Sequence, residues 1–150
     1  MIWLLRYEKG RLVEFMKRKI WTYAPEKTPK AKPPELVKIS VENKANELVN
    51  TVLKPAYIRP LPKNPQYNYI IDIYTKWHRS YFYFYAIYCC PFPNAISPSF
   101  DTGFARMEYT GKNQFSLSYM RHTGQWWEIY SELSLDECLV KIRDEEIFVK

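Results

Sequence analysis

Residues 67–90 read YNYIIDIYTKWHRSYFYFYAIYCC, and this stretch decides the fold. It contains two runs rich in Tyr, Ile and Phe, residue types that favour strands. A polar, turn-capable break at residues 76–80 separates the runs and predicts antiparallel strands at 68–76 and 80–90. The second run is apolar on both faces, and such a strand is usually covered on both sides. Its even-numbered residues are expected to face the core, which leaves three tyrosines on the opposite face: Tyr81, Tyr83 and Tyr85.

The other strands follow from alternation and turn signals. In the first strand, Ile71 and Ile73 are expected on one face and Ile70 and Asp72 on the other. The proline-rich residues 91–100 are not expected to continue the ladder. Alternation resumes, and turn-forming residues separate the remaining strands, predicted at 103–110, 114–121 and 126–130. Five strands joined mostly by hairpins predict an antiparallel meander.

Two helices are predicted to flank the strands. An apolar stripe with the helical period begins after two prolines and predicts a long helix that starts at Glu35 and stops at Pro55. The pattern of Ser134 and Glu137 is a capping box, which predicts a short C-terminal helix. The fold class is therefore α+β: a long N-terminal helix, a five-stranded antiparallel meander and a short C-terminal helix. The stripe of the first helix consists of Val37, Val41, Ala45, Leu48, Val49 and Val52.

The net charge of +6 is concentrated at the N-terminus. Residues 1–34 hold nine of the 22 basic and three of the 16 acidic residues, so the rest of the chain is neutral overall. We predict a flexible, basic, proline-rich extension at 1–34 and one domain at 35–150. The domain is not expected to bind nucleic acid, because its composition provides no excess positive charge. An alternative hypothesis gives the extension a role as a basic arm that contacts nucleic acid or an acidic membrane surface.

Composition excludes several classes of protein. Three cysteines do not make a disulfide framework, and neither a signal peptide nor a run of about 18 apolar residues is seen. A cytoplasmic location without a membrane span is therefore expected. Glycine-rich phosphate loops, the zinc-protease helix motif, the serine-hydrolase elbow and paired C-x-x-C motifs are missing. No cofactor and no metal site are predicted.

One catalytic hypothesis remains. In a simple meander, Cys89, Cys90, Asp101 and His122 all lie at the same end of the sheet. His122 would then act as base for a cysteine nucleophile, with Asp101 as its orienting carboxylate. The same cluster could hold a metal, although a fourth ligand at a recognisable spacing is missing. The more ordinary interpretation treats the two cysteines as small strand-end residues and His122 as a turn residue, with Cys138 packed in the core.

The second candidate site is a face of the sheet. Tyrosines beside a few convergent charges suit a protein partner or a small polar–aromatic ligand. Ser116 and Ser118 are expected to point outward on this face. The alternative is an ordinary exposed sheet face with cross-strand ion pairs. We favour a binding or interaction module that self-associates or binds a partner protein through this face and the 121–128 hairpin, with an enzyme as the alternative. The candidate binding residues are Tyr81, Tyr83, Tyr85, Arg106, Glu108, Arg121 and Trp126.

Overall fold

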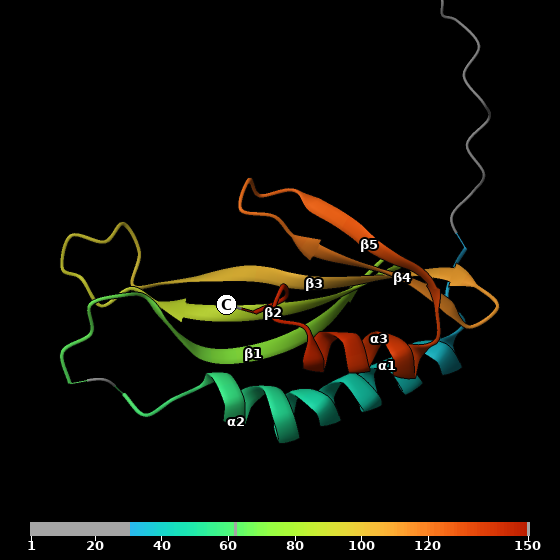
Figure 1. Ribbon diagram of the computed structural model, residues 1–150, viewed down its shortest axis with the longest axis horizontal. Helices are drawn as coiled ribbons and strands as arrows, with labels where there is room; N and C mark the ends of the chain where they lie inside the picture. Colours follow the sequence, from blue (N-terminus) through green and yellow to red (C-terminus); the bar gives the residue numbers. More distant parts are fainter. Residues whose placement is uncertain (1–30, 62, 150) are drawn as a thin grey trace, which may run out of the picture.

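The computed structural model describes residues 31–61 and 63–149, which form an α+β fold of two layers. One layer is a five-stranded sheet, and the other consists of helices packed on one of its faces (Figure 1). The extension predicted at 1–34 lies outside the described residues except for its last four. In the described part of the chain, no helix is both long and apolar enough to cross a membrane.

The sheet is a simple meander. Its strand order is β1-β2-β3-β4-β5, and each strand runs antiparallel to the next. The predicted fold class is confirmed at this level. The strands are β1 (Tyr69–His78), β2 (Tyr81–Cys89), β3 (Ser99–Gly111), β4 (Gln114–Met120) and β5 (Trp126–Leu133).

One tight hairpin joins β1 to β2, and another joins β3 to β4. The turn between β1 and β2 is only two residues long, shorter than the break predicted at 76–80, and Arg79 takes a positive φ of 58° there. The turn between β3 and β4 is the predicted one, and both of its central residues, Lys112 and Asn113, have positive φ. Positive φ at both positions gives the backbone twist that matches two paired strands.

The predicted alternation of β1 is wrong at its start. Ile70 and Ile73 are buried, whereas Ile71 is 43% exposed. A β-bulge between Ile70 and Asp72 adds one residue to the strand, which reverses the faces on either side of it. Beyond the bulge the expected alternation returns.

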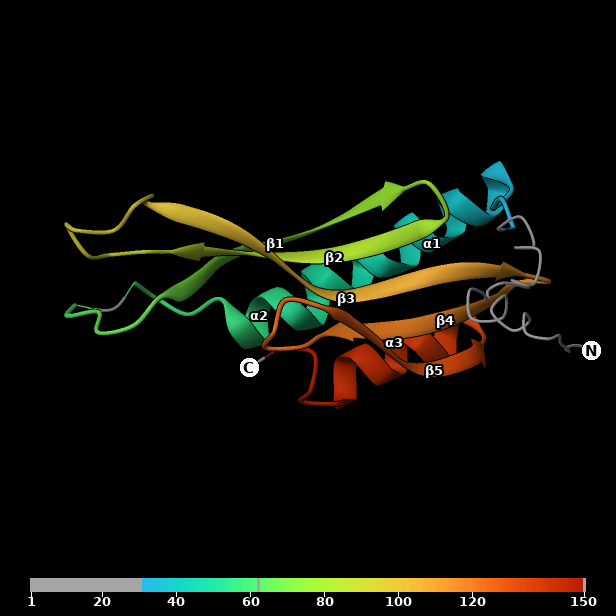
Figure 2. The same cartoon turned by 90° about the horizontal axis from the view of Figure 1, so that it is seen from above.

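The third strand begins earlier than predicted. Ser99 already pairs with Cys89, and the Cys90 amide donates to the carbonyl of Pro98 at 2.8 Å. The proline-rich segment 91–98 therefore forms the connection alone. As a result, β1, β2 and β3 extend well beyond the end of β4 (Figure 2).

The N-terminal helix is longer than predicted. It consists of α1 (Glu35–Leu48), the π-helical segment η1 (Val49–Leu53) and α2 (Lys54–Tyr57), and it continues through Pro55. A proline inside an α-helix loses one hydrogen bond and its ring clashes with the carbonyl four residues earlier. The wider π-helical turn just before Pro55 changes the carbonyl spacing there, which accounts for the continuation.

The core lies between this helix and the inner face of the sheet. On the helix, Val41, Ala45, Val49 and Leu53 are buried, and the π segment brings Leu53 inward in place of the predicted Val52. On the sheet, the even-numbered residues of β2 are buried as expected. The Trp77 indole also donates to the α1 backbone. The largest fully buried sheet residues are Phe82, Phe84, Ile73, Met107, Phe115 and Leu117.

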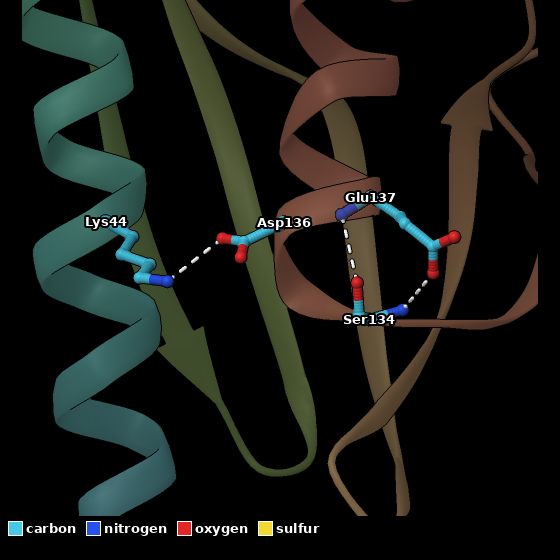
Figure 3. Close-up of polar contacts among 4 residues, drawn as sticks. All are labelled: Lys44, Ser134, Asp136 and Glu137. Atoms are coloured by element: carbon cyan, nitrogen blue, oxygen red, sulfur yellow. Dashed lines mark hydrogen bonds and ion pairs between the residues drawn. The ribbon is translucent and has the colours of Figure 1, made fainter.

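Helix α3 (Leu135–Asp144) begins at the predicted capping box. The Glu137 amide donates to the Ser134 hydroxyl at 3.2 Å, and the Ser134 amide donates to the Glu137 carboxylate at 2.8 Å (Figure 3). Asp136 forms an ion pair with Lys44 of α1 at 3.0 Å. Both charged groups are well exposed, so this pair adds little stability.

Candidate functional site

The tyrosines of β2 form a stack on the sheet face that points away from the helices. We call this surface the outer face and define it by Tyr74, Tyr81, Tyr83, Tyr85, Arg106 and Trp126. The rings of Tyr83 and Tyr85 stack with centroids 5.7 Å apart, and Tyr74 of β1 stacks on Tyr85 at 5.1 Å. All three side chains are half-buried. The period-2 pattern of β2 therefore gives an ordered aromatic surface.

A cation lies in the middle of the outer face. Arg106 of β3 pairs with Tyr83, and its guanidinium carbon lies 4.4 Å from the Tyr81 ring centroid and 5.0 Å from that of Trp126. Its Nε atom is buried and has no hydrogen-bond partner among the described residues. Aromatic faces attract a guanidinium through their quadrupole. The two rings thus fix the position of a charge that its neighbours only partly satisfy.

Trp126 reaches the outer face from the start of β5. It pairs with Met120 of β4, yet its ring lies 5.8 Å from that of Tyr83 on β2. The indole can cross β3 because Gly103 has no side chain there: a Cβ atom at Gly103 would lie 2.9 Å from Trp126 Cζ2. Figure 1 shows β5 at the edge of the sheet, curving upward and away from α1 and α3. The Trp126 ring therefore supplies part of the second cover that β2 was predicted to need.

An acidic group lies at one end of the stack. Tyr74 donates a hydrogen bond of 2.6 Å to the Asp101 carboxylate. This bond, together with burial, raises the pKa of Tyr74 to about 12. Burial raises the pKa of Tyr85 as well. Both hydroxyls are therefore protonated at neutral pH. The Tyr74 proton is engaged by Asp101, whereas the Tyr85 hydroxyl can donate a hydrogen bond to a ligand.

The predicted outward serines are on the correct face but are not exposed. Ser116 and Ser118 are each only 3% exposed. Ser118 pairs with Arg106 on one side and Glu128 on the other, and Ser116 pairs with Glu108. Both serines thus lie beside larger side chains on paired strands, which accounts for their burial. Glu108 itself lies opposite Tyr81 on the outer face.

The structure does not bring the cysteines and His122 together. Cys89 pairs with Ser99, whereas the β3–β4 pairing ends six residues further along β3, at Ala105 and Tyr119. Six strand residues cover roughly 20 Å, and the chain from Tyr119 to His122 can recover only about half of this distance. Along the strand direction, roughly 10 Å therefore still separates Cys89 from His122, which is far beyond hydrogen-bond reach.

The groups of the catalytic hypothesis have other neighbours. A hydrogen bond with Cys89 raises the pKa of Tyr69, and the Asp101 carboxylate accepts from Tyr74. Cys138 is fully buried, and desolvation raises its pKa to about 12, as expected of a packing residue. Within residues 31–61 and 63–149, no three His, Cys, Asp or Glu side chains gather closely enough to hold a metal ion.

A pocket of about 380 Å³ lies at the end of β4, beneath the turn that contains His122. The residues that line it come from distant parts of the sequence. Tyr88 and Phe104 belong to the extended β2–β3 strands, and Phe148 belongs to the segment after α3. This pocket was not predicted, although the apolar run 147–149 after a polar helix end indicates a buried segment. The lining residues are Tyr88, Thr102, Gly103, Phe104, Met120, Arg121, His122, Gly124, Ile147 and Phe148.

The turn above the pocket is well defined. The Gly124 amide donates to the Arg121 carbonyl at 2.9 Å, and the Arg121 amide donates to the Gln125 carbonyl at 2.8 Å. Gly124 has a φ of +83°, which only glycine adopts without strain. The Arg121 guanidinium lies 4.6 Å from the Trp127 ring centroid. These contacts hold Arg121 at the rim of the pocket, where His122 of the same turn also lies.

Comparison with known proteins gives a family but no activity. The chain matches no curated protein and no solved structure. A family model described as a domain of unknown function, DUF3024, matches residues 33–150, which include every strand of the sheet and all three of α1, α2 and α3. Since this match covers most of the sequence, the chain belongs to the DUF3024 family.

Proposed function

We propose that the chain is a binding module that self-associates through its outer face. The observation that carries the proposal is the composition and exposure of this face. The helices of the described chain all pack on the other side of the sheet (Figure 1), and a half-buried array of tyrosines with one tryptophan and one arginine lies on this side. Tyr, Trp and Arg are the residue types enriched at the centres of protein interfaces.

The ring stacks support a binding role on energetic grounds. Association costs free energy when side chains lose rotamer freedom at the interface. Here Tyr83, Tyr85 and Tyr74 are already held by ring stacking, and Arg106 is held between two aromatic rings. A partner that packs on this face therefore gains apolar burial at a low ordering cost. A second copy is the partner that we propose, because two such faces offer each other tyrosine hydroxyls, rings and charges of both signs.

Sedimentation velocity over a range of protein concentrations tests self-association. Tyr85→Glu places a carboxylate at the centre of the aromatic stack, and we expect it to weaken dimerisation by at least tenfold, since central aromatic residues carry much of the binding energy of an interface. Tyr67→Glu is the matched control, because Tyr67 is 79% exposed and lies outside the outer face. It should dimerise like the unmodified protein.

Two results would contradict the proposal. One is a protein that stays monomeric at several hundred micromolar, well above the range of a specific interface. The other is an equal loss of dimer in Tyr85→Glu and Tyr67→Glu, which would indicate a general effect of added charge. Far-ultraviolet circular dichroism of each variant would show whether the fold is intact.

A further inference from the structure

We infer that the pocket beneath the 121–125 turn binds a small carboxylate with an apolar, single-ring or branched body. The pocket is separate from the proposed self-association and would be present in the monomer. Its volume of about 380 Å³ falls in the lower part of the range typical of small-molecule sites. A single-ring ligand fits this size.

The walls of the pocket suit the apolar part of such a ligand. Phe104 and Phe148 are only 6% and 5% exposed, and Ile147 packs against the core next to them. Apolar walls of this kind favour an apolar group over water. They also make the interior less polar, which strengthens a charge–charge contact at the rim.

The rim of the pocket carries a cation that suits a carboxylate. Arg121 and His122 line the pocket, and none of the residues of the described chain that line it is acidic. Arg121 is always charged and presents a planar set of donors that matches a carboxylate. Within the described residues, its guanidinium contacts the Trp127 ring and forms no hydrogen bond or ion pair, so its N–H groups can donate to a ligand.

Two hydroxyl groups complete the set of donors. Thr102 and Tyr88 both line the pocket. Burial raises the pKa of Tyr88, so this hydroxyl stays protonated and can donate to an anion over the whole neutral range. A carboxylate that entered beside Arg121 would thus find charged and neutral donors, with apolar surface for the rest of the molecule.

The test is a nuclear magnetic resonance titration of the full chain with phenylacetate, followed on the amide signals of Gly103, His122 and Gly124. Phenylacetamide is the matched control ligand, since it has the same shape without the charge. We expect saturable shifts at these amides with a dissociation constant on the order of 1 mM, the range for a ligand this small. The amide should bind at least tenfold more weakly.

Two variants of Arg121 test whether its charge binds the carboxylate. Arg121→Gln should weaken phenylacetate binding roughly tenfold or more, because it removes a charged hydrogen bond. Arg121→Lys should keep part of the affinity, which separates loss of charge from loss of the Trp127 contact. Arg59→Gln is the control, since Arg59 is exposed and does not line the pocket, and it should bind normally.

Three outcomes would overturn the inference. They are the absence of saturation by phenylacetate at 20-fold the expected constant (~20 mM), equal binding of phenylacetate and phenylacetamide, and shifts confined to residues outside the pocket. The comparison of the two ligands uses the unmodified protein, so it decides the question even if an Arg121 variant fails to fold.

Discussion

Replacement of Gly103 by alanine should displace Trp126 from the outer face. A Cβ atom at position 103 would lie 2.9 Å from Trp126 Cζ2, 3.2 Å from Trp126 Cη2 and 3.4 Å from Tyr85 Cε1. Carbon atoms in contact are normally about 3.5–4.0 Å apart, so the indole must move by roughly 0.5–1 Å. Gly103 does not have a positive φ, so alanine brings no backbone strain. The effect therefore comes from crowding.

The expected cost follows from two opposing effects. Overpacking of a well-packed site costs about 1–3 kcal/mol. Alanine also restricts the unfolded chain relative to glycine, which returns about 0.4–1 kcal/mol. We expect Gly103→Ala to lower the free energy of unfolding by about 1–2 kcal/mol. Urea unfolding monitored by circular dichroism measures this change, and the indole N–H signal of Trp126 in the nuclear magnetic resonance spectrum of the native protein reports its movement.

A double-mutant cycle tests the reasoning. In a Trp126→Leu background the shorter side chain leaves room for the new methyl group, so Gly103→Ala should cost little. The coupling free energy between the two positions should then be about 1 kcal/mol or more, as for residues in direct contact. Additivity within about 0.3 kcal/mol would refute the explanation, because it would mean that Gly103 is required for a reason unrelated to the indole.

Three further predictions concern caps and titrating groups. Ser134→Ala removes the cap of α3 and should lower the free energy of unfolding, measured in urea, by about 1 kcal/mol. Asp136→Asn breaks an exposed ion pair and should lower it by less than about 0.5 kcal/mol. The reverse order would contradict our assignment of the cap. Tyr74 titrates at about 12 in the folded protein and near 10 when unfolded. Its contribution to stability is therefore complete below pH 10 and is lost as the pH rises through about 12. Tyr74→Phe should lose less stability than the unmodified protein between pH 10 and pH 12, and equal slopes in urea unfolding would count against the hydrogen bond. The buried Cys138 thiol, whose pKa is raised to about 12, should react with a thiol reagent at pH 8 only after unfolding. The labelling rate is measured in a variant whose other two cysteines are serine. Equal rates in buffer and in urea would show that Cys138 is not buried.

Local patterns were enough to predict the order and direction of the strands. Alternation in β2 separates the core residue Phe84 from the outer tyrosines, and the turn at Lys112–Asn113 determines the partner of β3. These signals involve residues within a few positions of each other. The outer face was accessible to sequence analysis for the same reason, since a strand of period 2 must present its odd-numbered residues together.

Single-residue irregularities were not predictable in the same way. The bulge at Ile71 and the π-helical turn before Pro55 each change which residues are buried, and each depends on packing across the whole domain. The separation of Cys89 from His122 has a similar origin. It follows from the unequal lengths of β3 and β4. The prolines of 91–98 made the start of β3 hard to predict, and Ser99 was therefore assigned to the loop.

Gly103 connects the two surfaces for which we propose functions. Its missing side chain leaves the space that Trp126 occupies on the outer face, and the same residue lines the pocket. A ligand that entered the pocket would press on a backbone whose other contact is the indole held against Arg106 and Tyr83. Close-packed interiors transmit such displacements over short distances. If both sites function as proposed, phenylacetate should therefore shift the indole N–H signal of Trp126 in the nuclear magnetic resonance spectrum without touching it, and the Trp126→Leu variant should still bind phenylacetate.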